Sequence, residues 1–182
     1  MLINEKLQII KSDESLTNLL EEFCDCITLK ENETEEDYHF YTKEKYQVFV
    51  TNGGGGTFGF IGDNDINTSP IGYVSSEGEC GKIANNINDF LSLIVFFPYF
   101  WSDAIRFYSE NKEDGLAEYM LACENEIKED NPNYYDTQNE IATKLSIRRS
   151  DGILEVLIAT VESEPKFRAH SIEGDNECEQ LL

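Results

Sequence analysis

The sequence predicts an α+β fold in which an antiparallel sheet meander packs against N-terminal and C-terminal helices. Three observations support this prediction: an amphipathic helical pattern near the start, a run of short strand-like segments joined by turn residues, and a return to helical patterns in the second half. Elements segregated in this order are typical of α+β proteins, because short links between successive strands favour antiparallel pairing.

The first predicted element is a helix with one apolar face. Its apolar residues follow the spacing of one helical face, and they are Leu16, Leu19, Leu20, Phe23 and Ile27. Either Ser12 or Asp13 can cap its first turn. The preceding segment, Leu2 to Ile10, fits a short strand or an irregular arm. Residues 31–37 carry five acids in seven positions and are typical of a solvated connection.

Four strand-like segments rich in aromatic and β-branched residues follow, and they cover residues 38–41, 46–51, 57–61 and 71–75. Asn52 and the four glycines after it separate the second segment from the third and predict a hairpin turn. Residues 62–70 predict the next turn. Because these links are short, we expect the strands to form an antiparallel meander.

A loop expected at Glu77 to Gly81 leads into a helix. Its apolar face begins at Ile83 and continues to Phe97, and Pro98 should end the helix. This stretch also contains the longest apolar run, twelve residues from Phe90 to Trp101. A membrane-spanning helix needs roughly 20 apolar residues, so the run predicts a core helix and no membrane association.

The last third of the chain continues with helical patterns. Apolar faces fall at residues 116–127, 141–145 and 154–161, with a break at Asn131-Pro132-Asn133 and with Asp151 as the candidate cap of the last helix. Lys166 to Ile172 fits a closing edge strand, and Glu173 to Leu182 has the composition of an acidic tail.

Charge is the second strong signal. The 182 residues include 14 Lys plus Arg and 36 Asp plus Glu, a net charge of −22. Such a surface repels nucleic acid and anionic lipid and attracts basic partners. The alternative is that the charge serves only solubility.

The cysteines predict a cytoplasmic protein with reduced thiols. There are five, an odd number scattered along the chain, and the N-terminal residues have no secretion-signal pattern. Cys24 and Cys26 are separated by one residue, unlike the two-residue spacing of a redox or zinc site, so we expect one thiol on each side of a helix.

No motif predicts catalysis, a metal or a cofactor. The glycine run lacks the Lys, the Ser or Thr and the following helix of a phosphate loop. Counting from Asp63, a calcium loop would need Gly at Thr68 and Glu at Val74. The two histidines, His39 and His170, lie outside any nucleophile–base motif.

Two acidic turns are the candidate partner-binding residues. Glu77 and Glu79 flank Gly78 at the expected strand-to-helix junction, and Asp63 and Asp65 lie on a neighbouring turn. We expect both turns to present carboxylates together at one edge of the sheet, since loops on a rigid scaffold commonly carry function. The alternative is that residues 77–81 only form a tight connection.

A set of glycine and apolar positions between Tyr46 and Trp101 also forms a recognisable pattern. It comprises Asn52-Gly53-Gly54, Phe60-Ile61-Gly62, Ser75-Ser76-Glu77-Gly78 with Gly81 and Ile83-Ala84, and Asp89-Phe90-Leu91 with Pro98. In these residues the chain resembles the SUKH superfamily, which includes yeast cell-wall assembly regulators and many bacterial proteins that neutralise polymorphic toxins. The resemblance implies a single domain over residues 1–182, with a core at about 12–107 and a helical C-terminal extension at about 108–182.

The resemblance implies an immunity protein that binds and blocks a bacterial toxin domain without catalysis. The net charge suggests a toxin with a basic surface, for example a nuclease, because a nuclease holds phosphates in a basic groove. Three alternatives stay open: a regulatory adaptor that binds several cellular proteins, an enzyme with an unrecognised carboxylate site, and an acidic mimic of nucleic acid.

Overall fold

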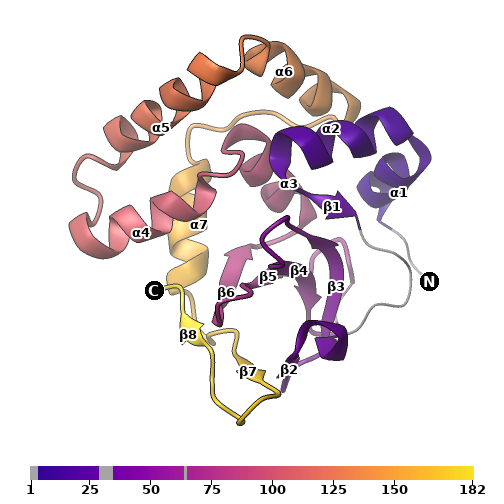
Figure 1. Cartoon of the computed structure of the whole chain (residues 1–182), viewed down its shortest axis with the longest axis vertical. Helices are drawn as coiled ribbons and strands as arrows, with labels where there is room; N and C mark the ends of the chain where they lie inside the picture. Colours follow the sequence, from indigo (N-terminus) through magenta and orange to yellow (C-terminus); the bar gives the residue numbers. More distant parts are fainter. Residues whose placement is uncertain (1–3, 29–34, 64) are drawn as a thin grey trace.

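The computed structural model describes residues 4–28, 35–63 and 65–182, and it has the predicted α+β architecture (Figure 1). The described strands are β1 (Ile27–Thr28), β2 (Phe40–Thr42), β3 (Tyr46–Thr51), β4 (Thr57–Ile61), β5 (Ile71–Val74), β6 (Glu79–Ala84), β7 (Ala169–Ser171) and β8 (Glu179–Gln180). The described helices are α1 (Glu5–Ser12), α2 (Glu14–Cys24), the 3-10 helix η1 (Glu35–Tyr38), α3 (Ile87–Phe96), α4 (Trp101–Asn111), α5 (Leu116–Asp130), α6 (Tyr134–Lys144) and α7 (Ile153–Glu162).

The main sheet has the strand order β1-β3-β4-β5-β6-β8, and its central strands form the predicted antiparallel meander. The hairpin between β3 and β4 is confirmed. The N–H of Asn52 donates to the carbonyl of Gly56 over 2.9 Å, and Gly55 takes a left-handed conformation with φ of 80°. A side chain rarely adopts this conformation, which explains a glycine at that position.

The prediction of a loop at Glu77 to Gly81 that leads directly into a helix is wrong. Residues 79–84 form β6, which pairs with β5, and the helix begins only at Ile87, where Asn86 caps it. Ile83 and Ile87 are four residues apart and imitate a helical face, but Ile83 belongs to the strand. Most of β6 is buried, so the strand lacks the alternation of apolar and polar residues that would have identified it.

Helix α3 covers one face of the sheet. The ring of Phe90 lies 5.4 Å from Phe49 and 5.1 Å from Phe58, and Trp101 at the start of α4 packs against Tyr73 at 5.2 Å. These aromatic contacts join the helices to the sheet in one core, since large rings bury much apolar surface. The end of α3 just before Pro98 confirms that prediction.

The other face of the sheet holds a smaller core around Tyr46. Its ring stacks on Phe167 at 5.1 Å, and its hydroxyl lies 3.1 Å from the carbonyl oxygens of both Thr57 and Gly72. An added Cβ at Gly59 would lie 2.5 Å from the Tyr46 ring, so the glycine leaves the space that the ring occupies. Gly59 therefore serves the packing of this smaller core.

Two strands pair differently from the prediction. The segment 38–41 was expected in the meander, but η1 ends at Tyr38 and β2 pairs with β7 in a separate ribbon beside the small core. The closing strand expected at Lys166 to Ile172 is shortened to β7, and its partner is β2. The expected acidic tail contains β8, which pairs in parallel with β6 and places Leu181 against Gly81.

The N-terminal part of the chain also differs from the prediction. Residues 5–12 form α1, capped by Asn4, instead of a strand or an irregular arm, whereas the predicted cap Asp13 does begin α2. The expected connection at residues 31–37 lies mainly outside the described residues. Cys24 ends α2 and Cys26 follows it, and both are buried, so the expectation of thiols on two sides of a helix is wrong.

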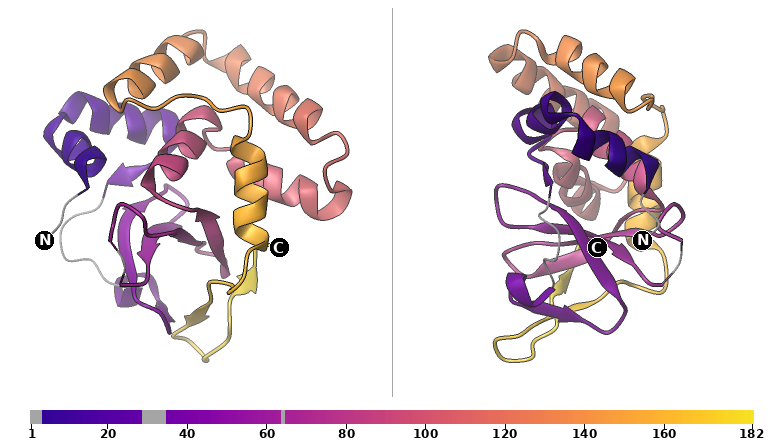
Figure 2. Two further views of the ribbon diagram at one scale, coloured as in Figure 1. Left: turned by 180° about the vertical axis from the view of Figure 1, so that it is seen from behind. Right: turned by 90° about the vertical axis from the view of Figure 1, so that its right-hand side faces the viewer.

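The C-terminal helices are longer than predicted and share the main core. Helices α5 and α6 form an arch away from the sheet, and α7 packs against β6 (Figure 2). Gly152, without a side-chain cap, precedes α7, so Asp151 is not its cap. Leu7, Phe90 and Leu157 belong to one hydrophobic cluster, which shows that residues 108–182 pack with the rest of the chain.

Candidate functional site

The two predicted acidic turns lie at opposite ends of the sheet. Thr57 pairs with Val74 and Phe60 pairs with Ile71, so the β4–β5 link and the β5–β6 turn leave opposite ends of the strands. Asp63 and Asp65 belong to the first, Glu77 belongs to the second, and Glu79 directly follows the second as the first residue of β6. The expectation that these four carboxylates gather at one edge is therefore wrong.

Asp63 and Asp65 also have local partners. Asp63 accepts a hydrogen bond from the Lys45 ammonium over 2.9 Å, and both side chains are largely exposed. The carboxylate of Asp65 accepts from the backbone N–H of Asn67 over 2.9 Å and from its side chain over 2.7 Å. This arrangement closes a turn, a common structural use of Asp.

The opposite end of the sheet brings three separate segments together. The Ser76 hydroxyl donates to the carbonyl of Gly54 over 2.6 Å, which ties the β5–β6 turn to the glycine hairpin. Asp25, immediately after α2, accepts a hydrogen bond from the N–H of Gly53 over 3.0 Å. We call the surface formed by Glu22, Asp25, Glu77, Glu79 and Tyr99 the hairpin end.

Tyr99 is the exposed aromatic residue of the hairpin end. It follows Pro98 in the turn between α3 and α4, has φ of 64° and is 50% exposed. Its hydroxyl donates to the carbonyl of Glu22 over 2.5 Å, so the ring is held beside the last turn of α2. A positive φ is costly for a bulky residue, and such strain is concentrated at functional sites.

The carboxylates of the hairpin end share one electrostatic environment. Burial raises the pKa of Tyr73, and the nearby Glu79, Glu77 and Asp25 raise it further, whereas a hydrogen bond with Asn52 opposes the shift. Burial and Asp25 likewise raise the pKa of Tyr99. Among the described residues, no ion pair joins Glu22, Asp25, Glu77 or Glu79 to a basic side chain.

This geometry suits recognition of a basic surface. Unpaired carboxylates attract Lys and Arg, and a fixed tyrosine supplies contact area at a small cost in side-chain entropy. Sequence reasoning found Glu77 and Glu79 but missed Glu22, Asp25 and Tyr99. Asp25 had a detectable signal, because Asp is one of the few residues that take a left-handed conformation after a helix.

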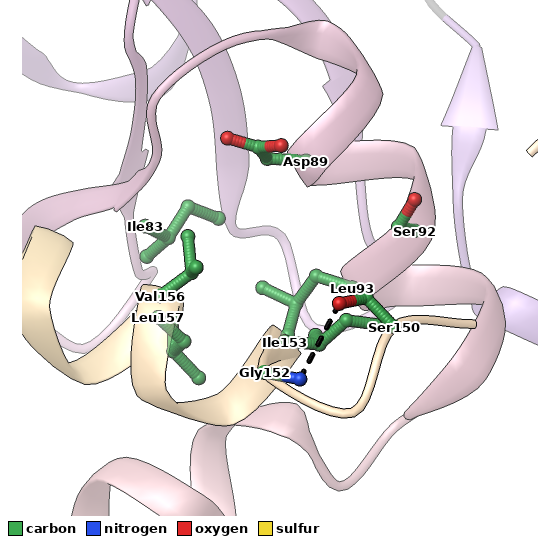
Figure 3. Close-up of a pocket in the computed structure, with 9 residues that line it drawn as sticks. All are labelled: Ile83, Asp89, Ser92, Leu93, Ser150, Gly152, Ile153, Val156 and Leu157. Atoms are coloured by element: carbon green, nitrogen blue, oxygen red, sulfur yellow. Dashed lines mark hydrogen bonds between the residues drawn. The ribbon is translucent and has the colours of Figure 1, made fainter. Parts of the chain in front are cut away.

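A small cavity lies between α3, β6 and α7 (Figure 3). Its volume is about 90 Å³, and Ile83, Leu93, Val156 and Leu157 give it a mainly apolar lining. Asp89 is the carboxylate in this lining, and it accepts a hydrogen bond from the helix cap Asn86 over 3.0 Å. The cavity thus gives no support to an enzyme that uses a pair of carboxylates.

Within the parts of the chain that the structure describes, no group of three or more His, Cys, Asp or Glu side chains is placed to hold a metal ion. No single helix among residues 4–28, 35–63 and 65–182 is both long and apolar enough to cross a membrane. Helices α3 and α4 reach the required length and composition only as a pair bent by 89°.

Comparison of the chain with protein-family models, with curated proteins and with solved structures gives no match. The resemblance to the SUKH superfamily therefore stays a prediction. The α+β fold and the hairpin end are the features on which a functional proposal can rest.

Proposed function

We propose that this chain is a non-catalytic binding protein that acts in the cytoplasm and neutralises a bacterial toxin domain by covering a basic surface on it. The observation that supports this function best is the hairpin end, where Glu22 and Asp25 lie near the exposed Tyr99 and have no basic partner among the described residues. The proposal keeps Glu77 and Glu79 from the predicted site, replaces Asp63 and Asp65, and adds Glu22, Asp25 and Tyr99.

Two physical arguments favour a basic protein partner. The net charge of −22 produces a long-range field that steers a basic partner toward the chain and repels nucleic acid. Steering of this kind raises association rates to on the order of 10⁸ M⁻¹s⁻¹ at low salt. At contact, Tyr99 supplies the aromatic anchor that is typical of energetically dominant interface residues.

The decisive experiment is a growth-rescue assay with a matched charge control. The toxic domain to test is the variable C-terminal domain of a large secreted protein encoded next to this chain, produced together with it in one cell. Wild-type chain should restore growth, Glu77→Lys/Glu79→Lys should abolish rescue, and Asp63→Lys/Asp65→Lys should retain it. The two variants change the charge equally at opposite ends of one sheet.

The outcomes separate the function from the site. Lack of rescue by the wild-type chain would contradict the immunity function for that domain. Rescue that survives the change at Glu77 and Glu79 but fails with the change at Asp63 and Asp65 would contradict the hairpin end. An association rate that stays constant from low to high salt would contradict the electrostatic part of the proposal.

A further inference from the structure

A groove lies between α6 and the segment that joins α6 to α7. After α6, residues 146–149 run back beside the helix as an extended chain (Figure 2). The groove between them has a volume of about 520 Å³. Its polar lining includes Asn139, Thr143, Ser146 and Arg148, and Phe96 and Ala142 contribute apolar surface.

The segment 141–150 beside this groove is rich in basic residues, although Glu140 and Asp151 flank it directly. Residues 141–150 contain Lys144, Arg148 and Arg149 and no Asp or Glu, although the chain has 36 acids. Two of these three cations are already engaged. Arg149 donates two hydrogen bonds to Glu124, over 3.0 and 3.2 Å, and Lys144 pairs with Asp13 over 2.6 Å.

Arg148 is the cation left for a ligand. Its side chain is exposed, it lines the groove, and no described residue forms an ion pair with it. Lys6 lies close by and donates to the carbonyl of Ser146 over 3.4 Å and to that of Leu145, so its charge also acts here. A planar guanidinium of this kind binds phosphate or carboxylate oxygens through two parallel hydrogen bonds.

We propose that the groove between α6 and residues 146–149 binds a small organic anion through a phosphate or carboxylate head group. The Arg148 guanidinium holds the head group, and the side chains of Asn139, Thr143 and Ser146 supply further hydrogen bonds. The body of the ligand lies against the floor of the groove, where Phe96 and Ala142 are 4% and 7% exposed. The volume lies within the range of about 300–1,000 Å³ that is typical of small-molecule sites.

The test is a titration of the full chain with four probes, followed by nuclear magnetic resonance of the arginine side-chain N–H groups. Phenyl phosphate and benzoate carry an apolar ring and an anionic head, inorganic phosphate lacks the ring, and benzylammonium carries the opposite charge. We expect a saturable shift of the Arg148 signal with phenyl phosphate or benzoate and none with benzylammonium. The relative affinities of the two ring-bearing anions identify the preferred head group.

The matched variants are Arg148→Gln and Arg106→Gln. Both arginines are exposed, but Arg106 lies on α4 beside Asp103. The Arg148→Gln variant loses a hydrogen bond to a charged group, so its affinity for phenyl phosphate or benzoate should fall by roughly tenfold or more. The affinity of the Arg106→Gln variant should stay unchanged. Equal affinity of both variants, or no Arg148 shift with any anion, would overturn the proposal. Equal affinity for inorganic phosphate and phenyl phosphate would overturn the role of the apolar surface.

Discussion

The ion pair between Glu124 and Arg149 gives the sharpest prediction for stability. Glu124 lies on α5, and only 5% of its side chain is exposed, whereas 41% of the Arg149 side chain is exposed. The guanidinium binds both carboxylate oxygens and stacks 5.2 Å from the centre of the Phe97 ring. The pair therefore joins the helical arch to the end of α3.

We expect Arg149→Met to destabilise the protein by about 2–3 kcal/mol. Methionine retains apolar contact with Phe97, so the main effect is a buried carboxylate without its partner. Removal of one partner from a fully buried pair costs about 3–5 kcal/mol. The expected value is lower here because water can reach the exposed part of the arginine site. For a domain of this size, the midpoint of thermal unfolding should fall by about 5–10 °C.

The assay is a double-mutant cycle measured by urea unfolding. Glu124→Leu combined with Arg149→Met removes both charges and should recover much of the lost stability, because the carboxylate is no longer buried alone. Arg168→Met provides the exposed control, since its pair with Glu177 is 53% and 40% exposed. That control should lose less than about 1 kcal/mol. Equal losses for Arg149→Met and Arg168→Met would refute the reasoning.

Three further predictions test the core, the pH dependence and a buried polar atom. Gly59→Ala should cost about 1–3 kcal/mol in urea unfolding, because its Cβ would lie 2.5 Å from the Tyr46 ring, and Tyr46→Leu should restore part of the loss. Hydrogen bonding to Lys144 holds the pKa of Asp13 below its ordinary value of 3.8, so its carboxylate stabilises the fold above that pH and this contribution is lost as the pH falls through the folded pKa. Asp13→Asn retains a capping side chain and should be less stable than wild type at neutral pH, and unfolding measured across a pH series should show the difference disappear in acid. The buried Nε2 of His170 has no partner among the described residues, so thermal unfolding of His170→Phe should show unchanged or higher stability, and a clear loss would reveal a hidden hydrogen bond.

The sequence allowed a correct prediction of the parts of the fold that depend on local signals. The strands β3, β4 and β5, the glycine hairpin and α5 each combine a clear pattern with turn or helix-breaking residues at both ends. Helix α4 was missed although its buried residues follow a helical spacing, namely Trp101, Ala104, Ile105 and Tyr108. The apolar run from Phe90 to Trp101 was assigned to a single helix that ends at Pro98, so the second helix was not predicted.

The pairings that failed depend on contacts between distant residues. The small ribbon joins Tyr41 to His170, and β8 joins Cys80 to Gln180, which no local pattern could indicate. Both late strands are short and polar, so they resemble a loop and a tail in sequence. Their stability comes from tertiary pairing and from neighbours such as Leu181 against Gly81.

The error in the candidate site has a different origin. Consecutive links of an antiparallel meander alternate between the two ends of the sheet. The predicted strands therefore already separated Asp63 and Asp65 from the turn that carries Glu77. The turn that carries Glu77 is tied to the glycine hairpin through Ser76, and the same hairpin binds Asp25 at the end of α2, while Tyr99 of the α3–α4 turn binds Glu22 of that helix. Only the packed structure places these segments together.

The distribution of charge explains why the hairpin end is the stronger candidate among the acidic surfaces. A net charge of −22 destabilises a compact chain through self-repulsion, and solubility alone requires no fixed position for any carboxylate. The described acids with basic partners, such as Asp13 and Glu124, join elements of the fold. Asp25, by contrast, is fixed by the backbone N–H of Gly53 and has no basic partner among the described residues, and the turn that carries Glu77 is tied to the same glycine hairpin. Carboxylates that are held in place but left unpaired do little to stabilise the fold and are well prepared to bind Lys or Arg from another molecule, which is the reason for assigning recognition to this end of the sheet.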